Sequence, residues 1–267
     1  MNRYALLSFD VEEFDMPLEY DFSISPEEQM RVGKNGLDAL APFLTDPSIQ
    51  STLFTTANFA MHYPDDIRRL AQQHEIASHT FYHSEFEDAH LLSSRTKLEE
   101  ISGKPVTGLR MPRMRKVSMA EVKKAGYRYD SSINPTWLPG RYNNTHLPRT
   151  AYHDEGILRI PASVSPFLRM PLFWLSFKNL PYNVFKIFLL QTLQKDGYVC
   201  LYFHPWEFTD IANYGLPGFT KKNHGEPLLD RLDKLVRDLK KETDLISMHD
   251  FVTQKNSVPT NVGTELL

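Results

Sequence analysis

Short apolar runs alternate along this chain with longer stretches in which apolar residues recur at helical spacing. The short runs are typical of buried strands: Tyr4–Phe9, Ser51–Thr55, Glu75–Ser78, Val106–Leu109, Gly156–Ile160, Tyr198–Phe203 and Leu245–Met248. The helical patterns cover approximately Ser25–Leu44, Tyr63–Gln73, Leu91–Ile101, Met119–Ala125, Asn183–Lys195 and Pro227–Lys241. Such alternation predicts a parallel sheet or barrel with crossover helices.

Two stretches lack this regular alternation. Asn134–Glu155 contains prolines and few periodic apolar residues, so we expect a long loop over one end of the fold. Pro166–Leu193 is apolar, but charges and prolines interrupt every window of about 18 residues, which excludes a membrane span. This second stretch fits a core-facing loop followed by an amphipathic helix, the interpretation we favour, or an apolar surface for a lipid-linked substrate. Residues 1–255 are expected to form one domain, and residues 256–267 a loosely held tail.

Composition narrows the class of protein. The chain has 267 residues, 41% of them apolar, and a formal net charge of -3, so no broad basic surface indicates nucleic acid. A single cysteine, Cys200, excludes an intramolecular disulfide and fits a reducing compartment. The N-terminal residues show no secretory signal pattern. Together these features predict a cytoplasmic protein.

An acidic cluster, Ser8-Phe-Asp-Val-Glu-Glu-Phe-Asp15, ends the first apolar run. In a strand, residues i and i+2 point to the same face, so Asp10 and Glu12 are expected to project together. Adjacent carboxylates repel unless a cation lies between them. The cluster therefore predicts either a cation site or, more simply, a solvated acidic turn.

His79 and His83 are four residues apart and can bind one metal ion from a helix face or from a turn that leaves a strand. Asp10, His79, Arg110 and a third histidine, His204, all fall at or just past the C-terminal ends of expected strands, where parallel α/β proteins place their chemistry. Carboxylates with three histidines are the residues of a metal-assisted hydrolase. The chain has no Gly-x-Ser-x-Gly elbow and no phosphate-binding glycine loop.

In this order the motifs resemble those of the polysaccharide deacetylase family with the NodB homology domain, carbohydrate esterase family 4. His79-Thr-Phe-Tyr-His83 and Arg110-Met-Pro112 match two family motifs, and Ser8–Glu13, Tyr129–Ser132 and Tyr202–Glu207 are similar to three others. The match is best to a subgroup with Asp-Val-Glu and His-Pro-Trp-Glu-Phe motifs. The resemblance implies a distorted (β/α)7-type barrel with a divalent metal at its C-terminal mouth.

The resemblance also implies roles for single residues. Asp10 would be the general base, paired with Arg110, and His204 the general acid, with Asp130 orienting it. His79 and His83 would be metal ligands. The family's third ligand is an aspartate at the position of Val11, which cannot bind a metal, so Glu12 is the expected replacement and Glu13 an alternative. Zinc is the leading metal, with cobalt, nickel or iron as alternatives.

Two further residues are expected to shape the substrate site. Arg113 stands where relatives carry an aromatic or small residue whose backbone N–H binds the oxyanion, so its side chain would alter a subsite. Trp206, next to the general acid, fits either a sugar-stacking wall or a packed aromatic.

We therefore expect hydrolysis of a sugar N-acetyl group, on a small saccharide, a nucleotide sugar or a lipid-linked saccharide. Surface polysaccharide biosynthesis, of O-antigen or capsule, is the expected context, with peripheral membrane contact if the substrate is lipid-linked. One alternative is a same-fold hydrolase of a linear or cyclic non-sugar amide. The other is a catalytically silent carbohydrate-binding relative.

Overall fold

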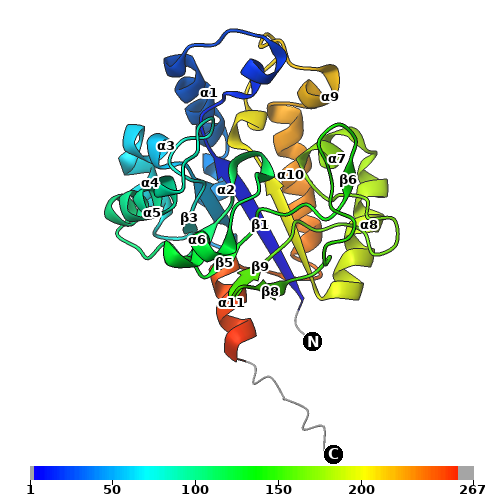
Figure 1. Ribbon diagram of the computed structural model, residues 1–267. Coiled ribbons are helices and arrows are strands. Elements are labelled where there is room, and N and C mark those ends of the chain that lie inside the picture. The colour runs from blue at the N-terminus through cyan, green and yellow to red at the C-terminus, as the bar shows by residue number, and fades with distance from the viewer. Residues whose placement is uncertain (1–2, 258–267) are drawn as a thin grey trace, which may run out of the picture.

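The computed structural model describes residues 3–257, in which helices lie around a curled sheet (Figure 1). The sheet contains nine strands within this range: β1 (Tyr4–Val11), β2 (Thr52–Thr55), β3 (Glu75–Ser78), β4 (Gly108–Leu109), β5 (Tyr129–Asp130), β8 (Tyr152–Asp154), β9 (Ile157–Arg159), β10 (Tyr198–Phe203) and β11 (Asp244–Leu245). A separate hairpin consists of β6 (Trp137–Leu138) and β7 (Tyr142–Asn143).

The α-helices are α1 (Pro26–Ala39), α2 (Ala41–Leu44), α3 (Ala57–His62), α4 (Pro64–Leu70), α5 (Ala89–Ser102), α6 (Met119–Lys124), α7 (Trp174–Asn179), α8 (Tyr182–Asp196), α9 (Gly218–Lys221), α10 (Glu226–Leu239) and α11 (Met248–Ser257). Three 3-10 helices are η1 (Met16–Tyr20), η2 (Pro112–Met114) and η3 (Pro205–Phe208). In the part of the chain that is described, no helix has the length and apolar character needed to cross a membrane.

The strand order is β10-β1-β2-β3-β4-β5-β9-β8, with β11 added beside the start of β1. All neighbours are parallel except β8 and β9. The segment after β9 lies beside β10, where the Ser163 amide donates to the Cys200 carbonyl at 2.9 Å. The expected barrel is thus confirmed as a curled sheet, which closes where the segment after β9 lies beside β10.

Strand β1 shows how this sheet positions chemistry. Its outward residues, among them Leu7 and Phe9, pack under the surrounding helices, while Leu6 points into a small inner core. Above Leu6, the inward positions continue with Ser8 and Asp10, both buried. The lower end of the barrel is therefore filled with apolar side chains, and its upper end with polar ones.

Several expected boundaries differ from the structure. The helix expected over Ser25–Leu44 is divided into α1 and α2, and a separate helix, α3, precedes the expected one at Tyr63. The strand expected at Leu245–Met248 ends at Leu245, and α11 begins at Met248. Helix α11 includes the first two residues of the expected tail, and residues 258–267 lie outside the described range.

The sequence predicted a long loop over Asn134–Glu155. This prediction was wrong in part, because the stretch contains the β6–β7 hairpin and strand β8. The apolar stretch Pro166–Leu193 divides into two environments. Its C-terminal part is core: Trp174 and Phe177 on α7 and Phe185 on α8 are buried. By contrast, Phe167 and Leu168, at the tip of the preceding turn, are 86% and 73% exposed.

Candidate active site

The acidic cluster at the end of β1 is buried, not a solvated turn. Asp10, Glu12, Glu13 and Asp15 are each at most 6% exposed. Carboxylates so deprived of water need cations or hydrogen-bond donors. Their partners therefore indicate what the cluster does.

His79 and His83 lie in the turn that follows β3, not on a helix. Thr80 between them adopts a left-handed backbone conformation, with φ of 63°. The carbonyl of Thr80 accepts the amide of Ala57 at 3.0 Å, so the turn is fixed against the start of α3. This fixed turn brings the two imidazole rings to a centroid distance of 5.6 Å.

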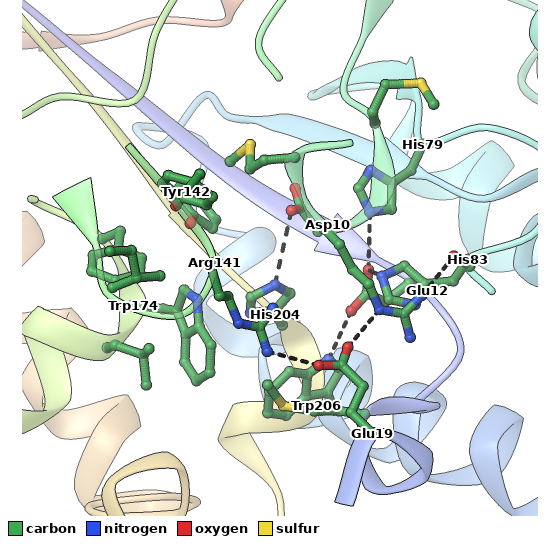
Figure 2. A pocket seen from close by; sticks show the side chains of 18 of the residues that line it. Asp10, Glu12, Glu19, His79, His83, Arg141, Tyr142, Trp174, His204 and Trp206 are labelled. Carbon is green, nitrogen blue, oxygen red and sulfur yellow. Dashed lines mark hydrogen bonds and ion pairs between the residues drawn. The ribbon is translucent and has the colours of Figure 1, made fainter. Parts of the chain in front are cut away.

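Glu12 lies between the two histidines (Figure 2). Its Oε2 is 3.0 Å from Nε2 of His79 and 3.1 Å from Nε2 of His83. Both rings use their other nitrogen elsewhere: Nδ1 of His79 donates to the Arg110 carbonyl at 2.8 Å, and Nδ1 of His83 lies 2.6 Å from Asp15 Oδ1. Bonds of this kind orient histidines that ligate metals.

The residues of this cluster fit a divalent metal. One ligand atom from each of Glu12, His79 and His83 lies within 4.8 Å of the others. Glu12 Oε2 is buried with no hydrogen-bond donor, which a cation would compensate. One carboxylate and two imidazoles suit zinc and related transition metals, and leave coordination positions open for water and substrate.

The neighbouring acids have other partners. The Glu13 carboxylate accepts hydrogen bonds from Thr56 and Asn58, both at 2.6 Å, and so turns away from the histidines. Asp15, to which the sequence assigned no role, binds His83 and also accepts from Arg113 at 2.9 Å. Of the two candidate replacement ligands, the structure brings Glu12, and not Glu13, to the histidine pair.

Charges within the cluster shift its protonation equilibria. Burial raises the pKa of the Glu12 carboxyl. The nearby histidines, led by His83, lower this pKa by more than burial raises it, so the net shift is downward. Burial lowers the pKa of His83, whereas Glu12 and Asp15 together raise it to about 9. Without a metal cation, a protonated His83 would supply the positive charge beside these carboxylates.

Asp10 and Arg110 form a buried ion pair. Nη1 of Arg110 donates to Asp10 Oδ1 at 2.6 Å and to the Ser8 hydroxyl at 2.9 Å, and the guanidinium lies 4.1 Å from the centre of the Phe54 ring. Burial lowers the pKa of Arg110, and the charge of Asp10 more than restores it. The second oxygen of Asp10 remains directed at the pocket.

His204 faces Asp10 from the end of β10, with Nε2 3.9 Å from Asp10 Oδ2 (Figure 2). Its Nδ1 lies 3.0 Å from Glu207 Oε1. The expected orienting residue, Asp130, is engaged instead with Ser132 and Arg159, because its neighbour Tyr129 takes the inner face of β5 and Asp130 points to the other face. Glu207 thus replaces Asp130 as the carboxylate that contacts His204.

Trp206 is a packed aromatic, not an open wall. It is 2% exposed, its ring stacks on His204 at 4.8 Å, and its Nε1 donates to Glu12 Oε1 at 3.0 Å. The indole therefore fixes the second oxygen of Glu12 and leaves Oε2 for the histidine pair. The sequence motif alone could not distinguish this role from sugar stacking.

The pocket above these residues has a volume of about 230 Å³. Its mouth is crossed by ion pairs: Glu19 on η1 accepts from Arg113 at 2.5 Å and from Arg141 of the β6–β7 hairpin at 2.7 Å. Arg113 is therefore neutralised by Glu19 and Asp15 and not directed freely at a subsite. Apolar and aromatic side chains complete the walls: Met16, Met111, Met114, Leu138, Tyr142, Phe173, Trp174, Leu175, Tyr202 and Phe219.

The chain is similar to known proteins in part of its sequence and in its fold. A family model described as polysaccharide deacetylase matches residues 28–129, which include the histidine turn and Arg110. No curated protein matches the chain. A solved structure from Mycobacterium smegmatis, assigned to the polysaccharide deacetylases, has 17% sequence identity and a TM-score of 0.61, and the alignment covers 99% of this chain and 94% of that one.

Two other solved structures share the fold. One from Pseudomonas aeruginosa PAO1, also assigned to the polysaccharide deacetylases, has 14% identity and a TM-score of 0.61 over 92% of this chain and 88% of that one. The allantoinase PuuE has 17% identity and a TM-score of 0.56 over 91% and 86% of the two chains. At such identities the likeness establishes the architecture of the barrel.

Proposed function

We propose that the chain is a member of the polysaccharide deacetylase family and, on that premise, a metal-dependent hydrolase that removes the N-acetyl group of an amino sugar. The observation that carries the proposal is the convergence of two sets of residues in one pocket. Glu12, His79 and His83 offer three ligand atoms, and Asp10 and His204 flank them. A catalytically silent relative would have no need of this complete arrangement.

The chain's own residues account for the proton transfers. Asp10, directed by Arg110, takes a proton from the attacking water as the new C–O bond forms. His204 then gives its Nε2 proton to the sugar nitrogen as the C–N bond breaks, which releases acetate and a free amine. When bound, a divalent cation at Glu12, His79 and His83 would supply Lewis acidity for the amide carbonyl and for the water.

The cavity favours a small substrate. Its volume of about 230 Å³ is below the usual range for ligand pockets, about 300–1,000 Å³. The hairpin and the Glu19 ion pairs restrict the mouth further, so we propose that one acetylated sugar unit enters end-on. This unit could be free or joined to a nucleotide or lipid carrier during surface polysaccharide synthesis, which we place in the cytoplasm.

A lipid carrier would bring the protein to a membrane, and Phe167 and Leu168 are exposed apolar side chains for such contact. Sedimentation with lipid vesicles checks this part. Co-sedimentation of the wild type, lost in a Phe167→Ser/Leu168→Ser variant, is the expected result. Wild type left in solution would limit the substrate to soluble saccharides.

Metal analysis and acetate release test the central proposal. We expect about one equivalent of metal per chain, zinc before cobalt, nickel or iron, and loss of that metal in His79→Ala/His83→Ala. The metal-loaded enzyme should release acetate from N-acetylglucosamine derivatives. Protein that binds none of these metals would contradict the proposal.

The allantoinase PuuE has this fold, so hydrolysis of a small cyclic amide is the competing function. Screening allantoin and related cyclic amides beside acetylated sugars separates the two. If the protein hydrolyses a cyclic amide and releases acetate from no sugar, the proposed substrate class is wrong. The proposed metal site would be unaffected by that result.

A further inference from the structure

Behind the ring of His204 lies a buried pair of charges, Glu207 on η3 and Lys178 on α7. Glu207 Oε1 accepts the backbone N–H of His204 at 2.9 Å and lies 3.0 Å from its Nδ1. Glu207 Oε2 lies 2.8 Å from Nζ of Lys178. Both side chains are 0% exposed, so water contributes nothing to their charge balance.

Lys178 is fully buried, and its ammonium has further partners besides Glu207. Its ammonium donates to the Thr220 carbonyl at 2.9 Å and lies 5.2 Å from the centre of the Trp174 ring. A buried ion pair usually contributes little net stability, because desolvation of both charges offsets their attraction. Stability alone is therefore a weak explanation for this pair, and its contact with His204 offers a functional one.

We propose that Glu207 and Lys178 are positioning residues that fix the tautomer and direction of the His204 ring for proton donation. This inference rests on the proposed function of His204 as the general acid. Because Glu207 accepts the Nδ1 proton, the ring must present Nε2 to the pocket. Lys178 keeps Glu207 in its charged, accepting form.

The surroundings of the ring support this arrangement. Packed against it are Trp206, stacked at 4.8 Å, and Trp174, edge-on at 5.1 Å, so the ring cannot turn freely. The charged groups that face it are Asp10 on β1, Glu12 directly after β1 and Glu207 on η3, all negative. Burial lowers the pKa of His204, but the bond to Glu207 and these carboxylates raise it above its ordinary value.

The Glu207–Lys178 pair acts on the proton transfer from His204 to the departing nitrogen. Protonated His204 donates its Nε2 proton to the departing nitrogen while the C–N bond breaks, and the ring becomes neutral. Its Nδ1 proton stays on the bond to Glu207 throughout. The proton that Asp10 has taken from water later returns His204 to its charged form through solvent.

Three variants test the proposal: Glu207→Gln, Lys178→Met and the combination of both. Asp196→Asn is the matched control, because it breaks the partly buried Arg149–Asp196 pair, joined at 2.6 Å, at a position away from His204. Each protein is measured in three ways. These are thermal unfolding, NMR titration of the His204 ring nitrogens in zinc-free and zinc-loaded protein, and the pH profile of kcat for acetate release.

In Glu207→Gln we expect the His204 titration midpoint to fall by about one pH unit or more, because a neutral amide replaces the carboxylate. The alkaline limb of kcat should move down by a similar amount, with about a 10- to 100-fold loss of kcat on that side. Both single variants should unfold at lower temperature. The double variant should regain thermal stability while its His204 midpoint remains low.

Asp196→Asn should lower the unfolding temperature and leave the His204 titration unchanged. If Glu207→Gln is too unstable for study, the double variant carries the test. An unchanged midpoint and tautomer of His204 in either would reduce the pair to a structural role and overturn the proposal. Absence of acetate release from wild type would refute the proposed function instead, and the NMR titration would still decide on positioning.

Discussion

Glu12 is the residue on which the metal site most depends, and Glu13 beside it is a natural control. Glu12 Oε2 faces both histidines, whereas Glu13 is occupied by Thr56 and Asn58. We expect Glu12→Gln to weaken zinc binding at least about 10- to 100-fold, since a neutral amide is a poor ligand. Glu13→Gln should bind zinc as the wild type does. Titration with zinc measures both, and equal affinities would exclude Glu12 as a ligand.

His83 gives the metal-free protein a characteristic pH dependence. Its pKa in the folded chain is raised from the ordinary value of 6.5 to about 9, against the effect of burial, by Glu12 and Asp15. A raised pKa means that charged His83 stabilises the fold fully below pH 6.5 and that this contribution is lost as pH rises through about 9. We expect the free energy of unfolding of chelator-treated protein to fall across this range.

The comparison that isolates His83 is His83→Asn, measured by urea unfolding at each pH. The variant should lack the decline that the wild type shows. With zinc bound, the wild type should lose its decline as well, because the ligand form of the imidazole is neutral. Parallel curves for wild type and His83→Asn in the absence of metal would contradict the pairing of His83 with the two carboxylates.

At the scale of single residues, local periodicity predicted some contacts and could not predict others. Alternation along a strand placed Asp10 and Glu12 on one face, and the structure has both in the pocket. Asp15 and Glu207 were missed because their partners, His83 and Lys178, are brought to them only by the tertiary fold. The sequence around Trp206 likewise does not indicate that its indole N–H donates a hydrogen bond to Glu12.

At the scale of elements, α1 supports the site through two glycines one turn apart. A Cβ on Gly36 would lie 2.1 Å from the carbonyl oxygen of Pro205, and one on Gly33 would lie 2.5 Å from that of Glu12. The helix therefore packs directly on the backbone that carries Glu12 and η3. Other side chains at these positions would push both segments inward.

We expect Gly36→Ala to destabilise the fold by about 1–3 kcal/mol, even though alanine favours helices, because backbone atoms cannot yield as side chains do. Displacement of η3 should also reduce acetate release. Gly218→Ala is the control, since a Cβ there meets nothing within 4 Å. Urea unfolding of the two variants tests the argument, and equal stabilities would show that α1 does not constrain η3.

Elements were predictable where burial alone determines them. Strands β3 and β10 have the expected bounds because each is a short, largely buried segment inside the sheet. The β6–β7 hairpin was taken for loop because its strands are two residues long and partly exposed. Similarly, α7 lies within an apolar stretch whose composition does not distinguish a helix from a core loop.

For the whole molecule, the alternation of strands and helices predicted a parallel sheet or a barrel with crossover helices, and the family resemblance implied the barrel. What the order could not give is how the barrel closes. Residues after β9 lie beside β10, where the Cys200 amide donates to Ser163 Oγ at 2.8 Å. Closure by irregular backbone leaves no periodic pattern in the sequence.

The metal connects the site to the stability of the whole chain. Glu12 comes from the end of β1 and both histidines from the turn after β3, so a bound cation would link segments about 70 residues apart in sequence and stabilise only the folded state. At a zinc concentration 100-fold above Kd, we expect a gain of about 2.7 kcal/mol in the free energy of unfolding. Calorimetry of chelator-treated protein, with and without zinc, measures the rise in Tm. His79→Ala/His83→Ala should show no rise, and an equal rise in both proteins would place the cation elsewhere on the chain.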